Sequence, residues 1–159
     1  MCIGGNCLRR CRIARTTATT STPGERPARA PLAQPPVRKD NTQARDVAIG
    51  MARILADTRC HQVTVLDVAG VSPVTDFFVI ATGSSARQMR SAVDAAEELG
   101  EQHGYPKLSR SGDDSANWIV LDCFDIIVHC FTQDARSYYD VDSMWGDARK
   151  VEWERPPQA

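Results

Sequence analysis

The sequence predicts a single α/β domain in which helices flank a mixed β-sheet. Segments with helical and strand periodicity follow one another in the order α-β-β-α-β-β-α between residues 41 and 147. Residues 77–82 are apolar on both faces, which is typical of a central strand. The Gly83-Ser84-Ser85 sequence that follows is typical of a strand that leads into a helix. At 159 residues, the chain is long enough for one hydrophobic core.

The first half of the domain is predicted to contain two helices and two strands. Apolar side chains recur at helical spacing over residues 41–58, which indicates an amphipathic helix. Residues 63–68 are rich in β-branched side chains and are predicted to form the strand before residues 77–82. Ser85 is expected to cap the second helix, with Gln88 completing a capping box. Gly104 is a natural stop for that helix.

The second half is predicted to contain a β-hairpin and a last helix. Residues 118–121 and 126–131 have strand composition, and residues 122–125 between them indicate a tight turn. Thr132 is expected to cap a last helix that continues to Trp145.

The two ends of the chain differ in composition from this central region. Residues 1–40 are rich in Arg, Thr and Pro, and such a segment has too little apolar area to offset its ordering entropy. We therefore expect a disordered basic tail over 1–40, the α/β domain over 41–147 and a second tail over 148–159. The N-terminal composition also resembles an organellar transit peptide. An ordinary basic tail, or a start codon assigned too far upstream, fits it as well.

Charge is distributed unevenly along the chain. Of its 19 basic and 20 acidic residues, eight basic and one acidic lie in residues 1–39, so the remainder carries 11 and 19. An acidic domain argues against direct sequence-specific binding of nucleic acid, which depends on Lys and Arg at phosphates. It favours docking onto a basic protein surface, because complementary fields raise the encounter rate.

The six cysteines are expected to be reduced thiols. The first 40 residues lack the apolar segment of roughly seven or more residues that a signal peptide needs, so a secreted disulfide framework is not expected. No stretch approaches the roughly 18–20 apolar residues of a membrane span. We expect a bacterial cytoplasmic protein, or an organellar one if the tail is a transit peptide. Cys2, Cys7 and Cys11 lack the spacing of a zinc site.

The Gly83-Ser84 loop is one candidate for enzymatic chemistry. Backbone N–H groups at a helix N-terminus can hold a phosphate, and nucleotidyltransferases then place two aspartates for magnesium on the next strand. Here residues 105–110 contain no carboxylate, and Asp140 and Asp142 lie in a predicted helix, where side chains two apart diverge. We predict no catalytic residue, no metal and no cofactor. A nucleotidyltransferase that uses the Gly83-Ser84 loop is kept as the alternative.

His129 belongs to two residue sets that could suggest a metal site or a hydrolase triad, and neither set fits that chemistry. His129 and Cys130 are adjacent in a strand and face opposite sides, so they cannot share one metal ion. A triad of Ser84, His129 and Asp125 would lack the Gly-x-Ser-x-Gly elbow of hydrolases. His129 is therefore predicted to be a structural residue.

The aromatic residues suggest a binding surface. Trp118 follows a polar loop, and Tyr138, Tyr139 and Trp145 lie in the predicted last helix. Trp and Tyr are favoured as interface anchors because they bury a large area at a small entropic cost. Packing of these rings in the core is the alternative. The acidic loop beside Trp118 favours a basic partner.

A series of short motifs runs through the folded region in a fixed order, over residues 44–149. They are Leu66-Asp67-Val68, Thr75-Asp76, Thr82-Gly83-Ser84-Ser85 with Arg87-Gln88, Gly112 with Ser115, Trp118-Ile119-Val120, Asp125-Ile126-Ile127-Val128-His129, and Tyr138-Tyr139 through Asp142 to Met144-Trp145. Together they resemble the ribosomal silencing factor family (RsfS, also called Iojap).

The resemblance implies a nucleotidyltransferase-like fold without catalytic residues. It implies a protein that binds the large ribosomal subunit through the subunit's fourteenth protein, blocks association with the small subunit and so represses translation. A factor for assembly of the large subunit is an alternative, and a homodimer is implied for the free protein. The residues implied to face the partner are Trp118, Tyr139, Asp142, Gly112, Asp113, Asp114 and Ser115.

The sequence departs from the family pattern at two positions. Ser111 stands where the family usually has Glu before the loop glycine, which leaves Asp113 or Asp114 to supply the acid. Phe124 stands where the hairpin usually has glycine. Because a bulky residue resists a positive φ, we expect this turn to be wider or differently twisted.

Overall fold

The computed structural model describes residues 41–112 and 116–155. The basic tail expected over residues 1–40 lies outside the described residues, as do residues 113–115 and 156–159.

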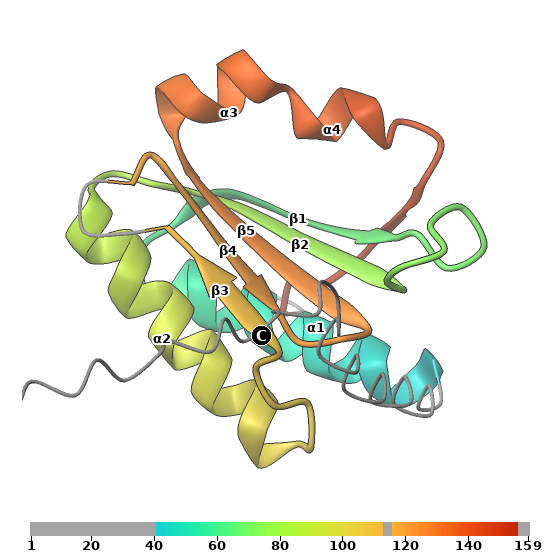
Figure 1. Ribbon diagram of the computed structural model, residues 1–159. Coiled ribbons are helices and arrows are strands. Elements are labelled where there is room, and N and C mark those ends of the chain that lie inside the picture. Colours follow the sequence, from blue (N-terminus) through green and yellow to red (C-terminus); the bar gives the residue numbers. More distant parts are fainter. Residues whose placement is uncertain (1–40, 113–115, 156–159) are drawn as a thin grey trace, which may run out of the picture. The chain divides into compact units, whose positions relative to one another are not determined.

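Six strands form one mixed sheet in the order β3-β4-β5-β2-β1-β6 (Figure 1). The strands are β1 (His61–Asp67), β2 (Phe77–Gly83), β3 (Ser109–Ser111), β4 (Trp118–Asp122), β5 (Ile126–Thr132) and β6 (Arg149–Val151). Strands β2 and β5 are parallel, and the other neighbouring pairs are antiparallel. Every residue of β2 is buried, which confirms the prediction of a central strand covered on both faces.

Helices cover both faces of the sheet (Figure 1). The long helices α1 (Asn41–Asp57) and α2 (Ala86–Gln102) lie on one face, and the short helices α3 (Gln133–Tyr139) and α4 (Val141–Met144) lie on the other. The α1–α2 face buries a core that includes Met51 and Met89. On the α3–α4 face, Phe78 and Phe131 pack with Val141 in a second cluster. The predicted α/β domain is confirmed.

The last helix differs from its prediction. Thr132 caps it as expected, since its hydroxyl accepts a hydrogen bond from the Ala135 N–H at 3.4 Å. The helix ends at Tyr139, because Asp140 adopts a left-handed conformation with φ 42°. A separate short helix, α4, follows. Asp140 is thus at the helix break and Asp142 lies in the helix after it, so the two carboxylates do not form a pair on a strand.

The folded region extends past residue 147, so the tail expected over 148–159 begins too early. Arg149–Val151 forms β6, which pairs with β1 at the edge of the sheet. The Trp153 indole N–H donates to the Val63 carbonyl at 3.2 Å, and Arg53 Nε donates to the Trp153 carbonyl at 2.9 Å. A strand of three residues contains too few alternations to be recognised from its sequence pattern.

The turn between β4 and β5 does not widen around Phe124, so the first of the two changes that we expected there, a wider turn, is wrong. Phe124 itself adopts the left-handed conformation with φ 68°. The turn stays tight, because the Cys123 N–H donates to the Ile126 carbonyl at 2.9 Å and the Phe124 N–H donates to Asp122 Oδ1 at 3.0 Å. These two hydrogen bonds hold Phe124 in the left-handed conformation, in which a Cβ atom is sterically unfavourable.

Phe124→Gly should therefore be more stable than Phe124→Ala by about 1 kcal/mol. Both variants remove the aromatic ring, and only the alanine keeps a Cβ at the left-handed position. Urea denaturation of the two variants measures the difference. Equal stabilities would show that the turn relaxes away from φ 68° at no cost.

Candidate partner-binding surface

Four aromatic rings form a connected cluster around Trp118 at the start of β4. The Trp118 ring stacks on Phe131 at a centroid distance of 5.0 Å and lies 4.9 Å from the ring of Tyr139. It also lies 5.9 Å from the His129 ring. Trp118 and Phe131 are opposite each other in the register of β4 and β5, and Tyr139 reaches them from the end of α3. Two residues implied to face the partner, Trp118 and Tyr139, therefore lie in contact.

His129 is part of this cluster and is structural, as predicted. Its Nδ1 lies 3.3 Å from the Trp118 indole nitrogen, which donates the hydrogen bond. Rings of Phe78, Trp118 and Phe131 surround it. Burial lowers the pKa of His129 to about 4, so the imidazole is neutral at physiological pH. Cys130, the next residue along, packs in the core of the opposite face.

Helices α3 and α4 expose large apolar side chains on the same face of the sheet as the cluster. Tyr138 is 82% exposed, Met144 is 73% exposed and Tyr139 is 47% exposed. We call Trp118, Tyr138, Tyr139 and Met144 the aromatic surface. The rings of Tyr138 and Tyr139 lie 5.1 Å apart, and exposed apolar residues gathered on one face typically mark an interaction site. Trp145, by contrast, packs on Phe78 at 5.1 Å and belongs to the core of this face.

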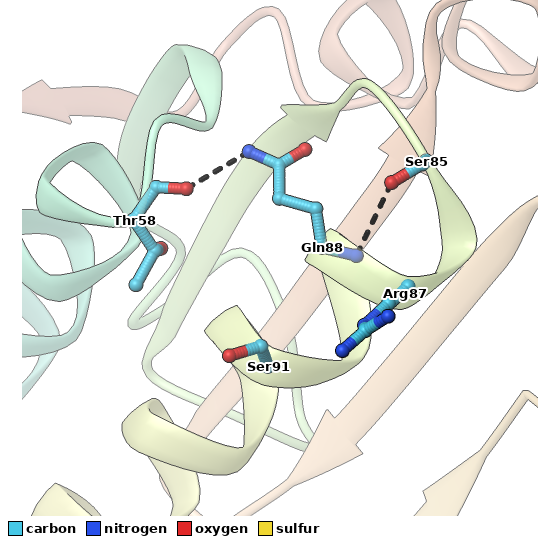
Figure 2. Close-up of a pocket in the computed structure, with 5 residues that line it drawn as sticks. All are labelled: Thr58, Ser85, Arg87, Gln88 and Ser91. Carbon is cyan, nitrogen blue, oxygen red and sulfur yellow. Dashed lines mark hydrogen bonds between the residues drawn. The ribbon is translucent and has the colours of Figure 1, made fainter.

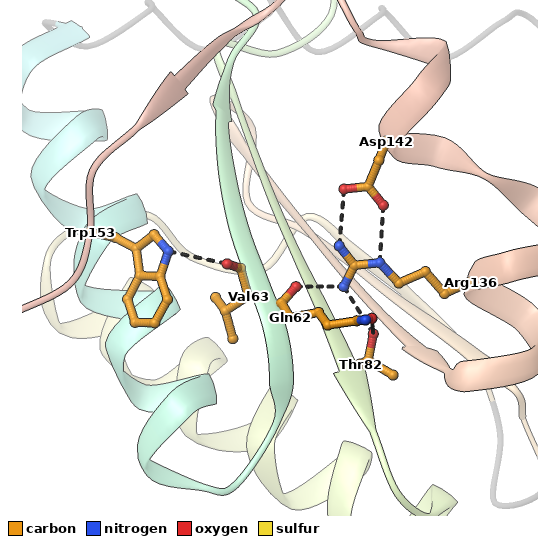
Figure 3. A network of polar contacts seen from close by, with 6 residues as sticks. All are labelled: Gln62, Val63, Thr82, Arg136, Asp142 and Trp153. Atoms are coloured by element: carbon orange, nitrogen blue, oxygen red, sulfur yellow. Dashed lines mark hydrogen bonds and ion pairs between the residues drawn. The ribbon is translucent and has the colours of Figure 1, made fainter.

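Asp142 is bound within the chain. Both of its carboxylate oxygens accept hydrogen bonds from Arg136, from Nε and from Nη2, each at 3.0 Å (Figure 3). The Asp142 side chain is 37% exposed, whereas that of Arg136 is 10% exposed. Arg136 could not be predicted from the sequence, because nothing in the pattern separates a buried arginine from the exposed ones. Asp142 thus lies at the edge of the aromatic surface, with an internal partner.

Gly112 is required next to Trp118. Its φ is 105°, and a Cβ atom there would lie 2.8 Å from the Trp118 carbonyl oxygen and 3.0 Å from the Ile119 Cα. Only glycine allows this close approach of two backbones. The loop therefore leaves β3 directly beside Trp118. Asp113, Asp114 and Ser115 lie outside the described residues.

The Gly83-Ser84 loop uses its donors internally. The Gln88 Oε1 accepts hydrogen bonds from the Ser84 N–H at 2.6 Å and from the Ser84 hydroxyl at 2.8 Å. The Ser85 hydroxyl accepts from the Gln88 N–H at 3.3 Å, which confirms Ser85 as the N-cap. The return contact of the predicted capping box reaches Ser84 instead of Ser85. The Gln88 side-chain oxygen occupies the Ser84 donors that a phosphate would need.

A pocket of about 300 Å³ lies beside this helix start and is lined by Thr58, Ser85, Arg87, Gln88 and Ser91. Figure 2 shows the Gln88 amide crossing it to the Thr58 carbonyl, to which Nε2 donates at 2.9 Å. The described residues that line it include no carboxylate. Over residues 41–112 and 116–155, no cluster of three His, Cys, Asp or Glu side chains could hold a metal ion.

The register of the sheet separates the residues of the hydrolase triad that we considered. His129 is opposite Ile80 in the parallel pair β2 and β5, and Ser84 lies four residues beyond Ile80. Asp125 lies four residues before His129 in the opposite direction. At about 3.3 Å per residue, each gap is roughly 13 Å. The three side chains therefore cannot form a catalytic triad.

The described cysteines are free thiols, as expected. Burial raises the pKa of Cys123 to about 12, and a hydrogen bond with Cys60 together with burial raises the pKa of Cys130 further. In the part of the chain that the structure describes, we find no helix with the length and apolarity needed to cross a membrane.

The fold and the surface define an α/β binding protein whose candidate site is an exposed aromatic patch. The family model described as "Ribosomal silencing factor during starvation" matches residues 41–159. The chain therefore belongs to the ribosomal silencing factor family, whose members are not enzymes. This membership confirms the resemblance seen in the sequence and decides against the nucleotidyltransferase alternative.

Individual relatives agree with this assignment. A ribosomal silencing factor RsfS of Halalkalibacterium halodurans is 34% identical over 98 residues, 62% of this chain and 84% of that protein. The chloroplastic protein Iojap of Arabidopsis thaliana is 26% identical over 113 residues, 71% of this chain and 47% of that protein. The crystal structure of a Chromobacterium violaceum protein has a TM-score of 0.61 at 22% identity, covers 74% of this chain and 95% of that one, and confirms the fold.

Proposed function

We propose that this protein binds the large ribosomal subunit and prevents the small subunit from joining it, which represses translation. The observation that carries the proposal is the contact between Trp118 and Tyr139 on an exposed surface that contains Tyr138 and Met144. Trp and Tyr that are partly exposed and already held in place by neighbouring rings are suited to anchor an interface. Membership in the silencing factor family supports the ribosome as the partner.

The contact on the subunit is proposed to be its fourteenth protein. The residues proposed to serve partner binding are Trp118, Tyr139 and Asp142, together with the loop from Gly112 through Asp113 and Asp114 to Ser115. Residues 40–159 carry 11 basic and 19 acidic side chains, so the domain presents an acidic field to its partner. Such a field favours binding to a basic protein surface over direct binding to RNA phosphates.

Two further properties belong to the same proposal. The free protein is a homodimer, which light scattering of the purified chain measures as molar mass. Its location is the bacterial cytoplasm, or an organelle if residues 1–40 direct import, since a chloroplastic protein is among the relatives. Mass spectrometry of the mature N-terminus distinguishes the two locations.

Co-sedimentation tests the binding step. The protein should pellet with purified mature large subunits and should stay in the supernatant with small subunits. Competition by the isolated fourteenth protein should release it from the large subunit. Equal recovery with both subunits would contradict the proposal, because it would indicate non-specific association with ribosomal particles.

A further inference from the structure

A buried arginine ties the two short helices to the sheet. Arg136 lies on the inner side of α3, is 9% exposed, and makes four hydrogen bonds (Figure 3). Two of them go to the Asp142 carboxylate on α4. The other two leave Nη1, for the Gln62 carbonyl on β1 at 2.5 Å and the Thr82 hydroxyl on β2 at 2.9 Å. One guanidinium thus joins α3, α4, β1 and β2.

The sheet is distorted where it receives this arginine. The register of β1 against β2 shifts between His61 and Thr64, and Gln62 has a left-handed backbone with φ 48°. A non-glycine residue in this conformation persists only when its surroundings over-determine it. Such a bulge redirects backbone groups out of the regular ladder. Here the Gln62 carbonyl is directed at Arg136 Nη1, so the bulge and the buried guanidinium form one unit.

Two short helices that carry part of the aromatic surface contact the sheet through this unit. Helices α3 and α4 have seven and four residues, and helices this short are not stable by themselves in water. Tyr139 follows Arg136 by one helical turn, and Asp142 lies in the helix that carries Met144. The helix breaks between them at Asp140, whose φ is 42°. Arg136 makes the hydrogen bonds from the described residues of these two helices to the sheet strands. Without it, apolar packing alone would set the angle between the helices and the sheet.

We propose that Arg136 is the positioning residue of the aromatic surface, and that Asp142 supports partner binding through Arg136 and not by touching the partner. The inference deepens the proposed function and rests on it. A planar guanidinium that donates two hydrogen bonds to one carboxylate fixes the relative orientation of the two side chains as well as the distance between them. It holds Tyr139 against Trp118 while Met144 stays presented to the partner.

Hydrogen exchange in the free protein tests the positioning role without the ribosome. Arg136→Met keeps an unbranched apolar side chain in place of the arginine stem and removes every donor. The amides of α3 and α4 should exchange roughly 10-fold faster or more in this variant, while those of β2 and β5 keep wild-type rates. Arg155→Met is the matched control, since Arg155 makes the same two-point contact with Asp57 on the surface. Unchanged exchange in α3 and α4 of Arg136→Met would overturn the proposal.

A double-mutant cycle on subunit binding tests the role of Asp142. Arg136→Met and Asp142→Asn should each weaken binding of large subunits roughly 10-fold, and the double variant should bind within about twofold of the weaker single variant. Arg155→Met should bind like the wild type. Additive effects, or a loss in Asp142→Asn alone, would show that Asp142 touches the partner directly and would overturn the proposal.

Two further results keep the test decisive. If Arg136→Met does not fold, Arg136→Lys replaces it: an ammonium keeps the charge but cannot make the two-point contact, so binding should fall and α4 should exchange faster. Wild-type behaviour of Arg136→Lys in both assays would overturn the positioning role. If the wild-type protein itself fails to bind large subunits, the proposed function is wrong, while hydrogen exchange still decides whether Arg136 positions the helices.

Discussion

Trp118→Ala should weaken binding of the large ribosomal subunit by roughly 30-fold or more, because a central aromatic anchor typically contributes about 2–4 kcal/mol. The structure gives two reasons for so large an effect. The indole stacks on Phe131 and also contacts the tilted ring of Tyr139, so it is held in place before the partner arrives. Its removal also frees Tyr139 to leave the aromatic surface. Equilibrium binding to purified large subunits measures the change.

The matched control is Trp153→Ala, the same truncation on the other face of the sheet. Trp153 is partly buried against the α1–α2 core and hydrogen-bonded to Val63, so its loss also lowers stability. It lies away from the aromatic surface and should leave subunit binding unchanged. Circular dichroism must show that both variants are folded. Equal weakening by the two variants would mean that lost stability, and not a lost anchor, explains the effect of Trp118→Ala.

Lowering the pH from about 7 to about 4.5 should destabilise the fold by about 2–3 kcal/mol through His129 alone. Burial lowers the pKa of His129 from 6.5 to about 4 in the folded protein. Between these two values the unfolded chain takes up a proton that the folded chain does not. The free energy of unfolding therefore falls as the pH drops through this range, and the stability is fully present above the unfolded pKa.

His129→Phe isolates this contribution. The variant keeps an aromatic ring between Phe78 and Trp118 but cannot titrate. It loses the acceptor for the Trp118 indole N–H, which lowers stability at every pH by about 1 kcal/mol. Urea denaturation at both pH values should show a smaller difference for the variant than for the wild type. The same pH dependence in both proteins would place the titrating group elsewhere.

The longer elements could be predicted because each carries several repeats of its period. The buried run of β2, the amphipathic helices α1 and α2 and the β4–β5 hairpin lie where the sequence places them, within one or two residues. The strands β3 and β6 were missed, since three residues contain a single alternation. The helix break at Asp140 was also missed, since no glycine or proline marks this position in the sequence.

The candidate site was predictable only in part. The sequence indicates Trp118 and Tyr139 as aromatic anchors, but their contact requires the register of β4 on β5 and the direction of α3. Asp142 shows the limit most clearly. Its partner Arg136 lies six residues earlier across a helix break, and the acceptor Gln62 lies 74 residues from Arg136 in the chain. Local periodicity contains no information about such a contact.

The proposed repression of translation requires that the bound protein exclude the small subunit from the large one. Light scattering of mixed large and small subunits measures their association directly as the protein is added. We expect association to fall to near zero once the protein saturates the large subunits, and to return when Trp118→Ala is used at the same concentration. Undiminished association of the two subunits at saturation, with the protein bound, would show that the protein does not exclude the small subunit.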